Sequence, residues 1–102
     1  MDDETKLSSA QRKKLKALGH ALDPVVYIGK EGLSPALVKS AQQAIKAHEL
    51  IKVKTGQNSP LDRTVAGKEL GGILEATVVQ IIGRMTLLYR ANPDLPADKR
   101  KI

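Results

Sequence analysis

The sequence contains no cysteine, no tryptophan and no phenylalanine, and only two tyrosines. Without cysteine, disulfides and thiolate metal sites are excluded. Proteins that read single-stranded RNA on a sheet or small barrel stack bases on several exposed rings, and two tyrosines cannot build such a platform. Tyr27 and Tyr89 lie in apolar runs, where we expect both to be buried. Any binding of nucleic acid should therefore depend on phosphates and shape.

Long apolar runs are also missing, and none approaches the roughly 20 residues that cross a bilayer. The first residues, from Met1 to Glu4, are mostly acidic, whereas a secretory signal is basic and then apolar. We therefore expect a cytoplasmic protein with no membrane partner. A chain of 102 residues fits one domain and is large enough for a single core.

Basic side chains are in excess, with 17 Lys and Arg against 11 acids and a net charge of +6. Residues 8–92 hold 13 basic and 6 acidic side chains, so the part expected to fold is the cationic part. Such a field attracts RNA, DNA or an acidic membrane surface, although net charge can also serve solubility alone. We expect an acidic flexible N-terminus at residues 1–7, a domain at residues 8–92 and a flexible basic tail at residues 93–102.

The apolar pattern predicts the order helix, strand, helix, strand, helix, strand, strand. Ser8 and Gln11 have capping-box spacing before a helix over residues 10–18, and Gly19 should end it in a left-handed conformation. The other elements are strands at 25–28, 50–55, 77–82 and 85–90, and helices starting near Pro35 and at Ser59-Pro60. The strand–helix–strand segments predict right-handed crossovers with parallel pairing, and the last hairpin is antiparallel. The predicted fold class is α/β, an α+β-like two-layer sandwich in which helices pack on a mixed four-stranded sheet.

The segment Gly29-Lys30-Glu31-Gly32 is the best candidate for a binding site. It lies between a strand and a helix N-terminus, where free backbone N–H groups and the helix dipole favour an anion. Its glycines would let a phosphate approach closely, and Lys30 adds a positive charge. The same GxxG pattern also fits an ordinary strand-to-helix turn. Further cationic candidates, interpreted as lying around this loop, are Arg12, Lys13, Lys16, Lys52, Lys54, Arg84 and Arg90. Each of these groups also fits an ordinary solvated face.

The two histidines do not indicate a metal site, because no cysteine or acid pair is spaced with them as ligands. His48 ends an apolar helical stripe, so we expect it to be a half-buried packing residue, and we expect His20 to be structural. The sequence contains no nucleophile–base–acid set, no Walker loop and no dinucleotide fingerprint. We therefore predict a protein that is not an enzyme, with no cofactor and no small-molecule substrate.

Short segments distributed over residues 8–91 resemble the bacterial YhbY proteins, the single-domain form of the CRM domain (chloroplast RNA splicing and ribosome maturation). The matching segments are residues 15–18 with His20, 24–26, 28–33, 48–54, 79–84 and 87–90. The resemblance implies a compact α/β RNA-binding fold in which Gly29, Lys30 and Gly32 form the contact loop. It also implies association with precursors of the large ribosomal subunit. Two acids depart from the family pattern: the family often has a small or amide residue in place of Glu31 and a basic residue near Asp23. These acids would weaken the anion site.

Three functions remain open from the sequence. The favoured hypothesis is a monomeric protein that binds structured ribosomal RNA and assists assembly of the large subunit without covalent chemistry. The second is a protein-interaction module that docks on the assembling particle without touching RNA. An RNA-processing enzyme is the third and weakest.

Overall fold

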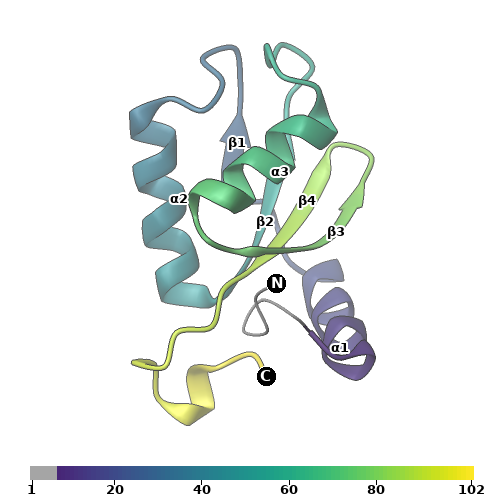
Figure 1. The fold of residues 1–102 in the computed structure, drawn as a ribbon, viewed down its shortest axis with the longest axis vertical. Helices are drawn as coiled ribbons and strands as arrows, with labels where there is room; N and C mark the ends of the chain where they lie inside the picture. The colour runs from purple at the N-terminus through teal and green to yellow at the C-terminus, as the bar shows by residue number, and fades with distance from the viewer. Residues whose placement is uncertain (1–6) are drawn as a thin grey trace.

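A computed structural model describes residues 7–102, which form three α-helices and a four-stranded mixed sheet (Figure 1). The predicted order of elements and the fold class are confirmed. The elements are α1 (Ser9–His20), β1 (Val26–Ile28), α2 (Pro35–His48), β2 (Leu50–Thr55), α3 (Arg63–Ile73), β3 (Thr77–Ile82) and β4 (Met85–Tyr89), followed by the short 3-10 helix η2 (Ala97–Lys99). Apart from Leu7, the acidic segment expected at residues 1–7 lies outside the described residues. No helix in the described range is long and apolar enough to span a bilayer.

The strands lie in the order β1-β2-β4-β3. β1 pairs parallel with β2, as predicted for a strand–helix–strand unit, and the β3–β4 hairpin is antiparallel. The prediction that β2 and β3 also pair is wrong, because β4 lies between them and pairs antiparallel with both. The hairpin thus places β4 at the centre of the sheet, where its Leu88 is fully buried.

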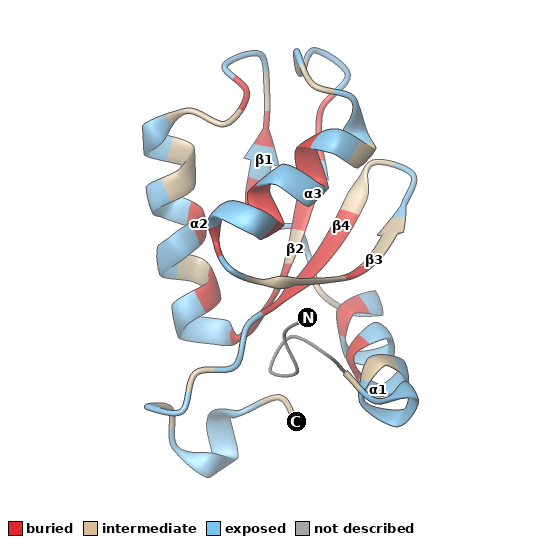
Figure 2. Ribbon diagram, in the orientation of Figure 1, coloured by how far each residue is buried: buried red, intermediate tan, exposed pale blue. Residues whose placement is uncertain are grey.

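Helices cover both faces of the sheet, so the expected two layers become three over part of the molecule. α2 and α3 pack on one face, against a core that includes Ile28, Val53 and Leu88. α1 packs on the other face through Leu15, at the end of the sheet that contains Leu50. Figure 2 shows buried residues along the strands and on the sheet-facing sides of the helices. The strand alternation explains both cores, because neighbouring residues of a strand point to opposite faces.

The start of α1 is as predicted and its end is not. The Ser8 hydroxyl accepts a hydrogen bond from the Gln11 backbone N–H at 3.0 Å, and the Gln11 side chain accepts one from the Ser8 N–H at 3.0 Å, which completes the capping box. The helix does not end at Leu18, and it continues through Gly19 to His20. A Cβ on Gly19 would lie 2.4 Å from a Leu87 methyl carbon, so this glycine serves close packing on β4 rather than a left-handed turn.

α3 begins later than predicted. The Ser59 hydroxyl bonds both the N–H and the carbonyl of Leu61, and it thereby stabilises a turn instead of a helix start. Asp62 is the N-cap, and its carboxylate accepts a hydrogen bond from the Thr64 N–H at 3.0 Å. Arg63 is therefore the first residue of the helix.

The C-terminal segment, predicted as a flexible tail, folds back on the domain around Glu49. The side chain of Glu49 is fully buried, and its two carboxylate oxygens accept hydrogen bonds from the N–H groups of Asn92 at 2.6 Å and Lys101 at 2.8 Å. The Arg100 Nε lies 3.4 Å from the same carboxylate. Ile102 packs against the smaller core beside Tyr89. No local pattern predicts this arrangement, because the contacts join positions about half a chain apart.

Candidate nucleic-acid interface

The GxxG loop is a tight turn in which both glycines face protein. The Gly32 N–H donates to the Gly29 carbonyl at 3.0 Å, and Gly32 has a φ of +64°, a conformation that favours glycine. Gly32 is buried, and a Cβ on it would lie 3.1 Å from the Pro60 side chain. A Cβ on Gly29 would meet the Tyr27 ring at 3.2 Å. The expectation that Gly32 is open to a phosphate is therefore wrong, because its N–H and its side-chain space are both occupied.

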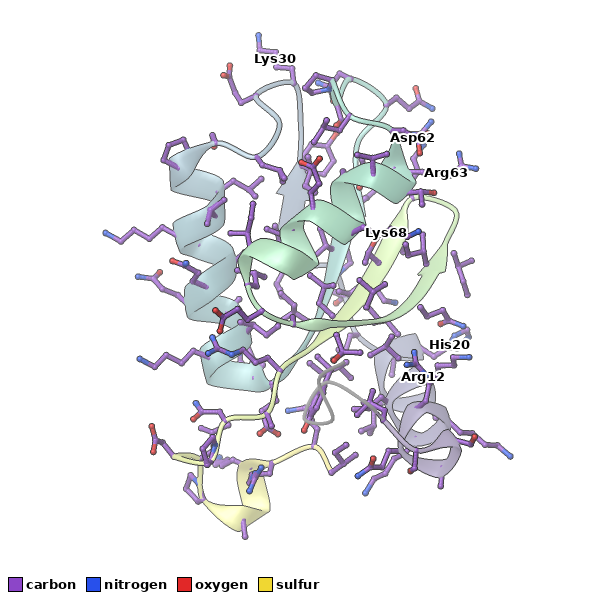
Figure 3. The ribbon with its side chains drawn as sticks, in the orientation of Figure 1. Arg12, His20, Lys30, Asp62, Arg63 and Lys68 are labelled. Atoms are coloured by element: carbon purple, nitrogen blue, oxygen red, sulfur yellow. The ribbon has the colours of Figure 1, made fainter. Side chains whose placement is uncertain are left out.

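The tip of this loop remains available to a ligand. Lys30 and Glu31 are exposed, and within residues 7–102 neither backbone N–H has a protein partner. Figure 3 shows the Lys30 side chain extending away from the fold. The loop leads into α2, whose N-cap Ser34 accepts from the Leu37 N–H at 3.2 Å. The positive end of a helix and one lysine at the same tip favour an anion, and the Glu31 carboxylate opposes it.

Lys54 and Arg84 lie at the same end of the sheet as this loop. The Gly56 N–H donates to the Ile28 carbonyl at 2.8 Å, which joins the end of β2 to the start of the loop. The Thr55 N–H donates to the Arg84 carbonyl at 2.8 Å, which places the hairpin turn beside β2. Lys30, Lys54 and Arg84 therefore lie at one end of the molecule, although they belong to three separate segments. Several cations placed together attract a polyanion.

Lys52 and Lys54 share the face of the sheet on which α1 packs, as the sequence predicts. Lys54 is exposed and Lys52 is half-buried. Ile51 and Val53, which alternate with the two lysines, are buried on the opposite face. None of the four strands contains an acid, so these two lysines are the only charged side chains within the strands. This face therefore carries positive charge without a neutralising partner in the sheet.

The cations of α1 do not surround the loop. Arg12 donates through Nη1 to the carbonyls of Val79 at 2.9 Å and Val78 at 3.3 Å, and it thereby attaches α1 to the edge strand β3. Arg12 thus has a structural role, and its part in an RNA contact stays a prediction. Lys13 and Lys16 are exposed. Figure 3 shows Arg12 on α1, well away from the Lys30 loop at the end of the molecule.

Arg90 is also remote from the loop. It follows Tyr89, which pairs with Leu50 at the start of β2, whereas Lys54 is close to the end of that strand. Its guanidinium lies 3.6 Å from the Glu75 carboxylate in an exposed ion pair. The expectation that these cationic groups lie around the loop is therefore wrong for α1 and for Arg90. Lys30, Lys52, Lys54 and Arg84 remain as the group at one end and face.

Two residues of this region, Arg63 and Tyr27, were missed or misread in the sequence. Arg63 begins α3 beside the loop that contacts Gly32 through Pro60. Tyr27 was expected to be buried, but 55% of it is exposed, on the same face as Lys54. The alternation of buried Val26, exposed Tyr27 and buried Ile28 was the signal for this, and it is hard to recognise in a three-residue strand.

The histidines do not form a metal site. His48, expected to be half-buried, is exposed at the end of α2. His20 lines a hollow of about 180 Å³ between the end of α1 and the sheet. Among residues 7–102, no group of three His, Cys, Asp or Glu side chains could hold a metal ion. Outside the candidate interface, burial raises the pKa of Tyr89, and the nearby Glu49 carboxylate adds to the effect.

A small α+β domain with a cationic face and a glycine turn at its end has the charge distribution that attracts a polyanion. Residues 7–90 match the model of the CRS1 / YhbY (CRM) domain, and the chain belongs to this family. The resemblance noted in the sequence is therefore confirmed.

Relatives of this chain are named for RNA binding. It is 38% identical over 87 residues to the "Probable RNA-binding protein PA4753" of Pseudomonas aeruginosa, a match that covers 85% of this chain and 84% of the relative. It is 37% identical over 101 residues to an "RNA-binding protein" of Haemophilus influenzae, covering 96% and 94%. Among solved structures, the hypothetical protein SAV1595 of Staphylococcus aureus is similar with a TM-score of 0.73 and 31% identity, covering 87% of this chain and 93% of that one.

Proposed function

We propose that this protein binds structured ribosomal RNA and assists assembly of the large ribosomal subunit, as a cytoplasmic monomer and without covalent chemistry. The single observation that carries the proposal is the convergence of Lys30, Lys54 and Arg84 at one end of the sheet, beside the N-terminus of α2. Lysines and a helix N-terminus neutralise phosphates without reading a particular base. Family membership and the names of the relatives support RNA as the polyanion.

In this proposal, the Lys30 side chain and the free backbone N–H groups of Lys30 and Glu31 hold one phosphate at the loop tip. Lys52, Lys54 and Arg84 hold neighbouring phosphates of the same strand. Such contacts stabilise one conformation of a folded RNA, which is what an assembly factor without catalytic groups can contribute.

The test compares two double variants that remove the same charge. Lys30→Ala/Lys54→Ala removes two cations of the proposed interface, and Lys39→Ala/Lys46→Ala removes two exposed cations of α2. We expect the first to weaken binding to protein-free ribosomal RNA roughly tenfold or more, because charge-assisted contacts are lost, and the second to have a much smaller effect. Equal weakening would mean that only total charge matters.

Protein-free RNA also separates the proposal from its alternative, a module that docks on proteins of the assembling particle. A docking module should bind precursor particles and fail to bind the RNA extracted from them. Retention on the particles after both lysine pairs are removed, together with no binding to the extracted RNA, would favour docking.

A further inference from the structure

The half of the sheet face that α1 leaves open has the composition of a surface for unpaired nucleotides. Across the four strands, Tyr27 pairs with Lys54, Lys54 with Met85, and Met85 with Ile82. Paired residues of neighbouring strands point to the same face, so these four side chains form one continuous row. Three steps between strands of about 4.8 Å give a row about 14 Å long.

This row is exposed although it is largely apolar. Tyr27 is 55% exposed and Ile82 is 59% exposed, which makes them the two most exposed large apolar residues of the described chain. α1 does not reach the row, because its last turn ends against Leu87, where Gly19 permits close packing. Lys54 stands between the aromatic ring and the apolar end, and no acid occurs in any of the four strands.

A hollow of about 180 Å³ adjoins the row on the side of α1. It is lined by the apolar residues Ile82, Met85 and Leu87 and by the polar residues His20, Lys52 and Gln80. An apolar lining with a few polar groups is the usual composition of a small-molecule site. Nucleobases have this chemistry, with two apolar faces and hydrogen-bonding edges.

We propose that this face binds a short unpaired segment of RNA, with one base stacked on Tyr27, a neighbouring base in the hollow and the intervening phosphate on Lys54. The inference rests on the proposed function and adds to it a mode of recognition, since phosphate contacts alone do not distinguish an unpaired strand from a duplex. Single strands bind to other proteins through the same combination of ring stacking and a positive track. A duplex cannot use this face, because its bases are stacked on one another and closed to the ring.

The position of Tyr27 supports stacking. Its ring lies over Gly29 and Gly56, where a Cβ on Gly56 would overlap the hydroxyl end of the ring. The two glycines therefore leave room for the ring at the end of the sheet, where 55% of Tyr27 is exposed. A tyrosine has only two side-chain torsions, so its ring loses little conformational entropy on binding a base.

The test uses tyrosine fluorescence and two RNA probes. The chain has no tryptophan and two tyrosines, so a Tyr89→Phe background leaves Tyr27 as the only fluorescent ring. The probes are an oligouridine of about ten nucleotides and an RNA duplex of the same length. We expect oligouridine to quench the Tyr27 emission as it binds, and the duplex to bind without quenching.

Affinity measurements in the wild-type background give a second readout. Tyr27→Leu should weaken oligouridine binding roughly 5- to 150-fold, the range for loss of one stacked base, and leave duplex binding unchanged. Tyr27→Phe should retain the affinity, because stacking does not need the hydroxyl. The matched control is Ile73→Ala, which alters an exposed apolar side chain of α3, on the other side of the sheet, and should affect neither probe.

The outcomes separate this inference from the proposed function. Unchanged Tyr27 emission with bound oligouridine overturns the stacking surface, and so does a Tyr27→Leu variant that binds oligouridine as tightly as the wild type. In either case, weaker binding of ribosomal RNA by Lys30→Ala/Lys54→Ala would still support the proposed function. Failure of the wild-type protein to bind any of the RNAs overturns both.

Discussion

Glu49 should be the most sensitive polar position for stability, because it holds the C-terminal segment from inside the protein. Glu49→Ala removes the acceptor of two backbone N–H groups, those of Asn92 and Lys101. Hydrogen bonds to a charged acceptor contribute about 1.5–3 kcal/mol each, so the two together contribute about 3–6 kcal/mol. Arg100 is about one-third exposed, and its pair with Glu49 adds at most about 1 kcal/mol. Release of the segment recovers chain entropy, so we expect a loss near the lower limit, about 3 kcal/mol.

The assay is thermal and urea unfolding followed by circular dichroism. In a domain of this size, 1 kcal/mol shifts Tm by about 4–8 °C, so Glu49→Ala should lower Tm by about 12 °C or more. Hydrogen exchange provides a local check, because the amides of Asn92 and Lys101 should be protected in the wild type and should exchange freely in the variant.

Glu75→Ala is the matched control. Glu75 and Glu49 are the two non-glycine residues of the described chain with positive φ, at 56° and 64°, so alanine has the same backbone cost at both positions. Glu75 differs in being exposed, with only a surface ion pair to Arg90, and its replacement should cost less than about 1 kcal/mol. If the two variants unfold at similar temperatures, the reasoning that Glu49 fastens the C-terminal segment is refuted.

Three further predictions concern single side chains. Gly32→Ala should destabilise the protein by about 1–2 kcal/mol because the residue has a left-handed backbone, and the contact with Pro60 should add a further loss. Gly83→Ala should lose only the backbone part, because Gly83 has a φ of +58° and no atom near its Cβ. Equal unfolding midpoints for the two variants would show that the Pro60 contact is unimportant. Arg12→Ala should lower the free energy of unfolding by about 1–2 kcal/mol, because two strand carbonyls lose their donor. Lys13→Ala should leave the free energy of unfolding unchanged. Similar effects of the two variants in urea unfolding would count against the structural role of Arg12. The pKa of Tyr89 is raised above 10.0 in the folded state, so its contribution is complete below pH 10.0 and is lost as the pH rises through the folded value. The urea midpoint of the wild type should therefore fall as the pH rises above 10.0, and it should fall less in Tyr89→Phe.

The sequence predicted the elements and the fold class well, because local signals specify them. The capping box at Ser8 and the alternation of Ile51 and Val53 with lysines depend on neighbours in the chain, and the structure confirms both. Errors arose where a distant contact decided the outcome. Gly19 stays helical because Leu87 lies against it, and β4 separates β2 from β3 because its side chains fit both cores.

The candidate site was predicted in part. The shared face of Lys52 and Lys54 follows from the period of a strand and is confirmed. Arg12 could not be recognised as structural, because its carbonyl partners in β3 are 66 and 67 residues away in the sequence. The buried position of Gly32 likewise depends on Pro60, a residue of another loop.

We expect this protein to bind RNA mainly through phosphates, on the group formed by Lys30, Lys52, Lys54 and Arg84. An equilibrium titration of a ribosomal RNA fragment at several salt concentrations measures this contribution. About four phosphate contacts predict a slope of log affinity against log salt of roughly −3 to −4, and a loss of affinity on the order of 100-fold between about 50 and about 200 mM salt. Lys54→Ala should reduce the magnitude of the slope by nearly one. Tight binding with a slope near zero would contradict the account, because apolar or uncharged hydrogen-bonded contacts would then dominate.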